Sequence, residues 1–204
     1  MAKLIWYFDN QGVLLPKGNL FICGQSGSGK TALSDYLCKV YEDDFEIVPN
    51  CTTRRARNSS ERHFRFMSED EFISCVNSNE FFMYRSGDKI KYGYLKSDYN
   101  SIIQRNKIPI FMFRLSGLEQ LSDKLSNCYI CIIQADIERS LLYSEDINAA
   151  RLADESRVVS DKLNKYISEN NMKNPLFVIR NEYNDSFFKN FVSSSFFLKL
   201  LDLV

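Results

Sequence analysis

Five short apolar runs with little internal alternation lie along the chain, a pattern typical of parallel strands covered on both faces. They are LFIC at 20–23, FEIV at 45–48, IPIFMFRL at 108–115, CYICII at 128–133 and LFVIR at 176–180. Polar, helix-forming stretches separate most of these runs, which favours right-handed crossovers between parallel strands. The pattern predicts an α/β fold in three layers, α/β/α, around a five-stranded parallel sheet.

Two polar stretches interrupt this alternation and predict insertions. Residues 49–106 contain a cluster of arginines and two strand-like runs, EFFMYRSG and KIKYGYLK. A capping-box spacing at Ser68 and Glu71 and a Ser97-Asp98 pair predict the starts of two helices. We interpret 49–106 as an inserted subdomain and the charged helical stretch 138–157 as a second mobile piece.

The ends of the chain carry apolar segments of their own. Residues 1–18 contain LIWYF and VLL around a turn, which predicts a hairpin packed at a sheet edge, with a partner surface or a lid as alternatives. The tail 186–204, SFFKNFVSSSFFLKLLDLV, predicts one amphipathic helix covering the sheet. The 204 residues suit a single domain.

The first apolar run leads directly into a phosphate-binding loop of the form G-x-x-x-x-G-K-[ST], and helical periodicity follows it. The loop consists of Gly24, Gln25, Ser26, Gly27, Ser28, Gly29, Lys30 and Thr31. Glycines allow backbone N–H groups to approach phosphate oxygens, Lys30 would reach the outer phosphates, and Thr31 would ligate Mg²⁺. The alternative is a Gly/Ser loop before an ordinary helix. The strand and helix on either side favour ATP binding.

Charge and cysteine content exclude some classes of function. The 26 basic and 26 acidic residues cancel, so no net field favours nucleic acid or an anionic membrane. No signal peptide or membrane span is visible, and a cytoplasmic protein is expected. Cys128 and Cys131 form a C-x-x-C motif, but positions i and i+3 of a strand point to opposite faces. Reduced core thiols are therefore favoured over a metal site.

An arginine-rich segment follows the second apolar run, so it should lie at the same sheet edge as the phosphate-binding loop. Hydroxyl and guanidinium groups suit a phosphate dianion, and Thr52, Thr53, Arg54 and Arg57 supply them. A solvated basic loop or a contact for an acidic partner would have the same composition. Residue types alone do not decide between a phosphate-binding site, a solvated basic loop and a contact for an acidic partner.

The order of motifs resembles the guanylate kinase family. TTRRAR at 52–57 is followed by an acidic residue, an aromatic-x-aromatic strand, an S-x-x-E-F helix, NEFF at 79–82 and KYGY at 91–94. The resemblance implies a kinase that moves the γ-phosphate of Mg-ATP to a nucleoside monophosphate, GMP or dGMP. It also implies ATP and Mg²⁺ as cofactors and a small-molecule acceptor as the binding partner. It does not indicate the oligomeric state.

The resemblance assigns roles to residues. Arg54, Arg57 and Tyr92 match the positions that hold the acceptor phosphate, with Thr53 beside them. Glu61 matches an acid near the acceptor and the metal. Phe64 stands where the family usually has a phosphate-binding tyrosine.

Other assignments concern the donor side and the lid. Asn181 would contact adenine. Arg151 and Arg157 would close over the transferring phosphate, with Arg139 and Lys162 as weaker candidates. The alternative for the lid arginines is ion pairing on an exposed helix, such as Arg151 with Glu155.

Three departures from the family pattern affect the acceptor. Met83 stands where the family has the glutamate that reads guanine, and Met112 and Arg114 stand where it has aspartates. A thioether is a weak acceptor, so base reading and metal support should differ. A sugar-phosphate acceptor, as in ribose bisphosphate phosphokinases, is one alternative. A nucleotide-gated interaction module using the hairpin or the tail is another. His63 shows no partner in the sequence, which disfavours a general-base role.

Overall fold

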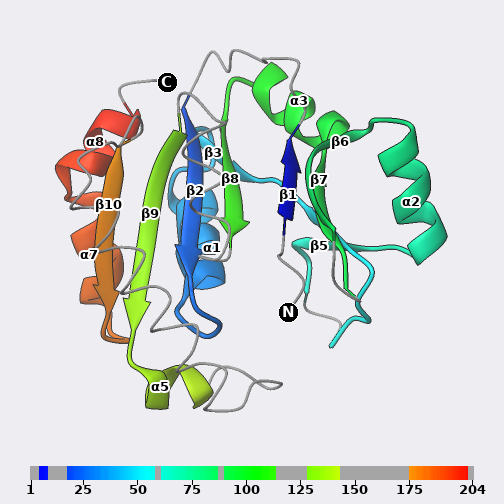
Figure 1. The fold of residues 1–204 in the computed structure, drawn as a ribbon. Helices are drawn as coiled ribbons and strands as arrows, with labels where there is room; N and C mark the ends of the chain where they lie inside the picture. The colour runs from blue at the N-terminus through cyan, green and yellow to red at the C-terminus, as the bar shows by residue number, and fades with distance from the viewer. Residues whose placement is uncertain are drawn as a thin grey trace.

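The computed structural model describes residues 5–8, 18–57, 61–86, 90–113, 128–142 and 175–201. Its larger sheet is parallel throughout, with the strand order β10-β9-β2-β8-β3 (Figure 1). These strands are β2 (Asn19–Gly24), β3 (Phe45–Ile47), β8 (Ile108–Phe113), β9 (Cys128–Ala135) and β10 (Leu176–Asn181). The prediction of an α/β fold with five parallel core strands is confirmed.

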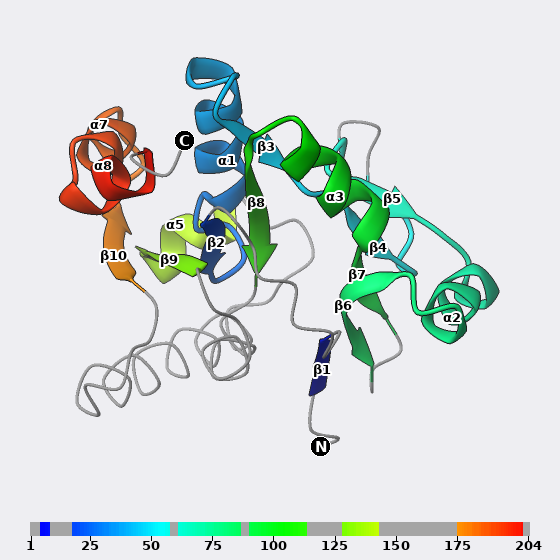
Figure 2. The ribbon, with the colours of Figure 1, turned by 90° about the horizontal axis from the view of Figure 1, so that it is seen from above.

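Three helices cover one face of this sheet (Figure 2). They are α1 (Lys30–Val40), α7 (Ser186–Val192) and α8 (Ser195–Leu201). Every residue of β2 is buried, and Leu20 and Ile22 pack on this face with Leu33 and Leu37 of α1. Burial on both sides explains why β2 has no polar alternation.

A second sheet and the helix α3 (Lys96–Gln104) cover part of the other face. Phe111 of β8 lies at the centre of this contact, with ring centroids 4.7 Å from Phe21, 5.0 Å from Tyr94 and 5.8 Å from Phe82. Tyr99 of α3 joins the same cluster. This aromatic packing joins the two sheets along β8.

The second sheet has the order β1-β6-β7-β4-β5. Its strands are β1 (Ile5–Phe8), β4 (Asn50–Thr52), β5 (Phe64–Phe66), β6 (Phe81–Ser86) and β7 (Tyr92–Leu95). Strand β1 pairs antiparallel with β6 and forms one edge of this sheet, so the N-terminal segment extends the inserted sheet and not the core. The predicted second strand of the hairpin, at 13–15, lies outside the described residues.

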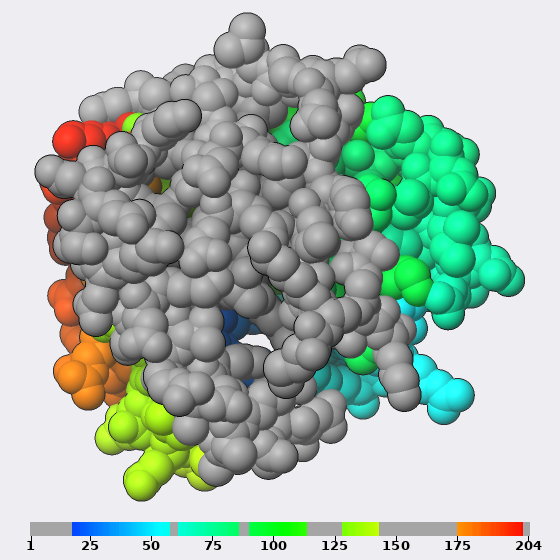
Figure 3. Space-filling view, viewed as in Figure 1, coloured from blue at the N-terminus to red at the C-terminus, as the bar shows by residue number. Residues whose placement is uncertain are grey.

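The inserted sheet stands beside the core, and the helix α2 (Glu69–Asn77) lies on its outer side (Figure 1). In the space-filling view the teal atoms of this part of the chain form one side of the molecule (Figure 3). The capping box that opens α2 is confirmed. Ser68 accepts from the Glu71 N–H, and the Glu71 carboxylate accepts from the Ser68 N–H. These reciprocal bonds satisfy two of the N–H groups that a helix start leaves without partners.

The predicted cap at Ser97-Asp98 is wrong. Helix α3 begins at Lys96 with Leu95 as its N-cap, and no side chain caps it. Asp98 lies inside the first turn, where it pairs with Arg65 of β5 at 2.8 Å. An acidic residue in the first turn interacts favourably with the helix dipole without being the cap. The N-cap Leu95 lies two residues before the predicted cap Ser97.

The prediction of a single C-terminal helix is also wrong, because α7 and α8 are separate helices. The break falls at Ser193 and Ser194. The Ser194 hydroxyl accepts from the Phe197 N–H at 3.2 Å and donates to the Phe191 carbonyl at 2.6 Å. Serine side chains compete in this way with helical backbone bonds.

The C-x-x-C motif lies on β9 with its two thiols on opposite faces of the sheet, as predicted. Burial raises the pKa of Cys128 to about 12 and that of Cys131 well above its ordinary value. All six cysteines are free thiols. None of the described helices is both long and apolar enough to span a bilayer.

Several predicted features lie outside the described residues. They are Arg114, the helix LEQLSDKLSN at 118–127 that the capping-box spacing of Ser116 and Glu119 predicts, Arg151, Arg157 and Lys162. Of the predicted lid, the structure describes α5 (Ile137–Leu142). The division into a hairpin, an acceptor subdomain and a lid stays a prediction.

Candidate active site

The phosphate-binding loop connects the end of β2 to the start of α1. Gly27 and Gly29 have φ values of 73° and 99°, a region that residues with a Cβ rarely adopt. A Cβ on Gly29 would also lie 2.5 Å from the Asn181 Nδ2 atom. The loop therefore requires glycine at position 29 for two independent reasons.

Residues at the end of β10 hold the carbonyl groups of this loop. Asn181 donates from its amide to the Ser28 carbonyl at 2.9 Å, and the Tyr183 hydroxyl donates to the Gly27 carbonyl at 2.9 Å. The Tyr183 N–H donates in turn to the Asn181 side-chain oxygen at 2.7 Å. Because C=O and N–H point in opposite directions in a peptide plane, fixing the Ser28 carbonyl turns the Gly29 N–H the other way.

A chain of polar side chains links the loop to α5. Gln25 donates to the Ser140 hydroxyl at 2.9 Å and to the Ala135 carbonyl at 3.1 Å. The Ser140 oxygen lies 2.9 Å from the Tyr183 hydroxyl. Since Tyr183 donates to Gly27, its oxygen accepts from Ser140, and each hydroxyl in the chain has a donor and an acceptor role.

Lys30 and Thr31, the two loop residues that would act on phosphate and metal, begin α1. The Lys30 ammonium donates to the carbonyls of Gly24 at 2.9 Å and Gln25 at 2.6 Å. The Thr31 hydroxyl lies 3.8 Å from the sulfur of Met112 at the end of β8. Both side chains line the cavity beside the loop.

The arginine segment forms a charged cluster after β4. Arg54 makes a bidentate ion pair with Glu61, with N–O distances of 2.9 and 2.5 Å. The Glu61 carboxylate also accepts from the Arg57 backbone N–H at 2.8 Å. The hydrogen bonds from Arg54 lower the pKa of the Glu61 carboxyl below its usual value. Glu61 therefore holds the Arg54 guanidinium in a fixed orientation.

Aromatic rings lie against the guanidinium groups of Arg54 and Arg85. The Arg54 guanidinium carbon lies 4.4 Å from the centre of the Phe64 ring and 5.2 Å from that of Phe66. The Arg85 guanidinium lies 5.0 Å from the centre of the Tyr92 ring. Cation–π contacts of this kind restrict where the charges lie.

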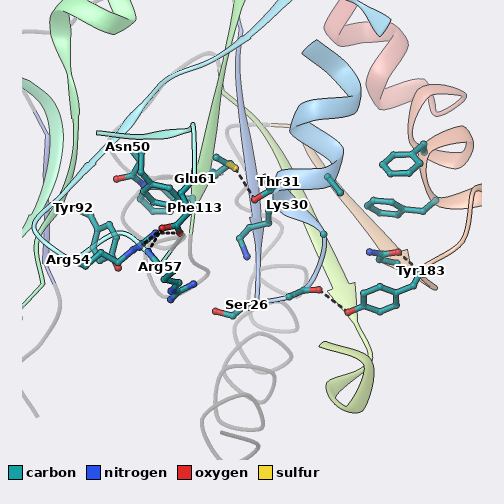
Figure 4. A pocket seen from close by; sticks show the side chains of 18 of the residues that line it. Ser26, Lys30, Thr31, Asn50, Arg54, Arg57, Glu61, Tyr92, Phe113 and Tyr183 are labelled. Atoms are coloured by element: carbon teal, nitrogen blue, oxygen red, sulfur yellow. Dashed lines mark hydrogen bonds and ion pairs between the residues drawn. The ribbon is translucent and has the colours of Figure 1, made fainter. Parts of the chain in front are cut away.

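The loop and the arginine cluster face each other across one cavity of about 580 Å³ (Figure 4). In the close view Arg54, Arg57 and Tyr92 stand on one side, and Lys30, Thr31 and Tyr183 on the other. The end of β10 and the start of α7 complete the wall with Asn181, Asn184, Asp185, Phe187 and Phe188. Basic side chains from the loop and from the arginine cluster thus line facing walls of one cavity.

Comparison with known proteins identifies the family of the chain. Residues 17–191 match the family model described as guanylate kinase. The chain belongs to the guanylate kinase family. This is a family of ATP-dependent nucleoside monophosphate kinases, so the predicted family and enzyme class are confirmed.

Individual relatives agree with this assignment. The guanylate kinase of Thermotoga maritima is 33% identical over 54% of this chain and 55% of its own length. That of Chlamydia trachomatis serovar D is 29% identical over 69% of this chain and 71% of its own length. The crystal structure of guanylate kinase from Anaplasma phagocytophilum superimposes with a TM-score of 0.62 at 14% identity, over 91% of this chain and 85% of that one.

The structure brings most of the predicted site residues of this family member into the cavity wall. Those that line it are Ser26, Gly27, Gly29, Lys30, Thr31, Arg54, Arg57, Glu61, Tyr92 and Asn181. Gln25 and Ser28 of the loop are buried and do not line the cavity. Thr53 exchanges two hydrogen bonds with Lys91, accepting at its hydroxyl at 2.9 Å, and so positions the start of β7. The ligand roles of all these residues stay predictions.

Sequence reasoning missed Tyr183 and Asn50, which also line the cavity. Tyr183 lies two residues beyond the last core strand, so the rule that ligands bind at the carboxyl edge of a parallel sheet could have found it. Asn50 donates to the Tyr94 hydroxyl at 2.9 Å, and Tyr94 donates to the Met112 carbonyl at 2.6 Å. No sequence signal indicated that chain of bonds.

The departures from the family pattern have different structural settings. Met83 is fully buried in the core cluster with Tyr94 and Phe113 and does not line the cavity. Met112 lines the cavity beside Thr31. Among the described residues no group of three or more His, Cys, Asp or Glu side chains could hold a metal ion. Mg²⁺ prefers oxygen ligands and retains waters, so Thr31 and nucleotide phosphates fit it better than the Met112 thioether.

His63 has a partner that the sequence did not show. Its Nε2 atom lies 2.6 Å from the carboxylate of Asp35 on α1. The two residues line a second, smaller hollow outside the main cavity. This position does not support a general-base role at the main cavity.

Proposed function

We propose that this protein transfers the γ-phosphoryl group of Mg-ATP to the phosphate of a nucleoside monophosphate, with GMP or dGMP as the first candidate acceptor. The observation that carries the proposal is the single cavity with Lys30 and Thr31 on one side and Arg54, Arg57 and Tyr92 on the other. The relatives named guanylate kinase support the choice of a guanine nucleotide.

The donor side would bind the triphosphate of ATP. The N–H groups of the loop and the helix start offer donors and a favourable partial charge to phosphate oxygens. The Lys30 ammonium, which now donates to two loop carbonyls, would exchange these for the outer phosphates. Mg²⁺ would be held by the Thr31 hydroxyl, the phosphates and waters, and would offset the charge that develops during transfer.

The acceptor side would hold the monophosphate dianion. Arg57 and the orientated Arg54 present N–H groups suited to two phosphate oxygens, and the Tyr92 hydroxyl would add a third donor. An acceptor oxygen would then attack the γ-phosphorus while its bond to the bridging oxygen of ADP breaks. Positioning and charge stabilisation supply most of the rate enhancement in such transfers.

The lid would complete the site. By resemblance, Arg151 and Arg157 would neutralise charge on the transferring phosphoryl group, and Asn181 would lie near adenine. The chain of bonds from Gln25 through Ser140 to Tyr183 supports a link between α5 and the loop.

A sugar phosphate is the second candidate acceptor, and the burial of Met83 favours it. Guanine presents N–H donors that a carboxylate accepts, but the position expected to supply one is packed in the core. The carboxylate of Glu61, on the acceptor side, is already paired with Arg54. An acceptor without a purine edge would not require the missing acid.

An acceptor screen tests the proposal. The protein would be incubated with Mg-ATP and each of GMP, dGMP, AMP, CMP, UMP, dTMP and ribose phosphates, and ADP release measured by a coupled assay. We expect turnover with at least one acceptor and none with the Lys30→Ala variant. Folded protein that binds ATP but phosphorylates none of the monophosphates would contradict the proposal, and turnover of ribose phosphates alone would favour the second candidate.

A further inference from the structure

Asp35 of α1 contacts the segment that leads into β5 of the inserted sheet. Its Oδ1 atom lies 2.6 Å from His63 Nε2 and 3.1 Å from an Arg62 nitrogen. A carboxylate oxygen accepts hydrogen bonds, so His63 Nε2 is the donor in this contact. The His63 side chain is 16% exposed, so solvent screens this contact only in part.

Arg62 and His63, the partners of Asp35, are adjacent in sequence to the charged residues of the proposed acceptor side. Arg62 and His63 follow Glu61, whose carboxylate orients Arg54 and accepts from the Arg57 N–H. The His63 carbonyl also accepts from the Asn50 N–H at 2.9 Å, which attaches this segment to β4. A shift of 61–63 would therefore move Glu61, and with it the Arg54 guanidinium.

Asp35 belongs to the same helix as the proposed donor-site residues Lys30 and Thr31. Asp35 lies on α1, five residues after Lys30, in the helix that the phosphate-binding loop opens. The hollow around it is lined by Ala32, Tyr36, Cys38 and Lys39 of the same helix together with Arg62 and His63. Besides Asp35, Lys39 is the charged side chain that α1 contributes to this hollow. Arg62 and His63 of the inserted segment form the opposite side of the hollow.

We propose that Asp35 is a positioning residue for phosphoryl transfer, which through His63 and Arg62 holds the acceptor-phosphate arginines at a fixed distance from Lys30. This inference rests on the proposed function, because it takes Arg54 and Arg57 as the acceptor-phosphate ligands. The aromatic cluster along β8 fixes the far side of the inserted sheet, and the Asp35 contact fixes the side next to the donor loop. Together these two attachments set the separation of the two substrates.

The Asp35→Ala variant tests this role by steady-state kinetics. The side chain of Asp35 is one-third exposed on a helix, where alanine is well tolerated, so the variant should fold. We expect KM for the acceptor to rise about three- to tenfold, the range for loss of a partly exposed charged hydrogen bond. KM for ATP should change less than about twofold.

Matched variants separate positioning from a general effect on folding. Asp35→Asn keeps an acceptor oxygen for His63 and should have a smaller effect than alanine. His63→Gln keeps a donor and should retain most of the wild-type KM, whereas His63→Ala should match Asp35→Ala. Asp43→Asn, an exposed carboxylate just beyond α1, serves as the control and should match wild type.

An independent measurement detects the contact without activity. His63 is the only histidine in the sequence, so imidazole ¹⁵N NMR reports on it without assignment. We expect a resolved, slowly exchanging Nε2–H signal in wild type that is lost in Asp35→Ala.

The two measurements distinguish the possible failures. If the NMR signal is absent, or the acceptor KM is unchanged in Asp35→Ala, the inference is wrong while the proposed function can stand. If no monophosphate is turned over by wild type, the proposed function fails first. A parallel rise in the KM of both substrates would also overturn the positioning role, because it would indicate a general disturbance.

Discussion

Arg54 and Glu61 form a bidentate ion pair that faces the phosphate-binding loop across the cavity. The pair is nearly buried, since the two side chains are 9% and 14% exposed. It therefore orients a guanidinium toward the place where the acceptor phosphate would bind. The Glu61 carboxylate therefore organises the arginine cluster on this wall of the cavity.

We predict that Glu61→Gln raises KM for the acceptor about tenfold, because an amide cannot make two charged hydrogen bonds to Arg54. The affinity for ATP should stay unchanged. Steady-state kinetics would measure KM for the acceptor, and isothermal titration with an ATP analogue would measure the affinity for ATP. Equal losses for the two ligands would contradict this assignment.

The pH dependence follows from the same pair. The pKa of Glu61 is lowered by the hydrogen bonds of Arg54, so the pair is intact above the ordinary carboxyl pKa and is lost only as pH falls through the lowered value. Acceptor KM should therefore show no Glu61-dependent rise between about pH 7 and 5. A rise in wild type that Glu61→Gln lacks would show that the carboxyl titrates in this range.

The Phe64→Tyr variant should gain acceptor affinity. Phe64 lines the cavity beneath the Arg54 guanidinium, at the position where the family usually has a tyrosine. A hydroxyl there would add one donor for the acceptor phosphate, and we expect KM to fall by about three- to tenfold. Phe66→Tyr, on a ring farther from Arg54 and outside the cavity wall, is the control. A lower acceptor KM in Phe66→Tyr but not in Phe64→Tyr would contradict the assignment.

The Tyr183→Phe variant should weaken ATP binding. It removes the hydroxyl that donates to the Gly27 carbonyl and accepts from Ser140, while the ring remains. Loss of these two partly buried hydrogen bonds predicts about a five- to tenfold weaker Kd for an ATP analogue, with the acceptor affinity unaffected. Tyr129→Phe, whose exposed hydroxyl makes a long contact of 3.4 Å, should bind ATP as wild type does. An unchanged Kd in Tyr183→Phe would show that the loop needs no such support.

The Gly29→Ala variant should lose ATP binding by about 100-fold or more. Its φ of 99° strains any L side chain, and the new Cβ would contact Asn181 Nδ2. The double variant Gly29→Ala/Asn181→Ala removes the contact but not the strain, so it should recover only part of the affinity. Wild-type binding in the single variant would contradict the described loop conformation. Circular dichroism would confirm that each variant is folded.

The core of the fold was predictable because its signals are local. Unbroken apolar runs identified the five strands, and the glycine pattern between Cys23 and Lys30 identified the loop. The capping box at Ser68 is likewise a short-range pattern of hydrogen bonds. Such features depend on residues only a few positions apart.

Most of the failures depend on distant residues. The divided C-terminal helix is the exception, because the Ser194 hydroxyl bonds to residues only three positions away. Asp98 forms an ion pair with Arg65 and does not cap α3. The C-terminal segment divides into two helices at Ser193 and Ser194. The pairing of β1 with β6, the Asp35–His63 contact and the support of Gly27 by Tyr183 join residues far apart in sequence. A single sequence carries no signal for such pairings. The family motifs predicted which residues gather at the cavity, but not what holds them there.

The most direct test of the account follows the phosphoryl group itself by ³¹P NMR. Wild type, Lys30→Ala and Arg54→Ala would each be incubated with Mg-ATP and the best acceptor from the screen. We predict that wild type forms ADP and the phosphorylated acceptor in equal amounts, that Lys30→Ala forms neither, and that Arg54→Ala requires at least about tenfold more acceptor for the same rate. Release of ADP and inorganic phosphate without a phosphorylated acceptor, or wild-type behaviour of Arg54→Ala, would contradict the claim that the arginine cluster holds the acceptor of this kinase.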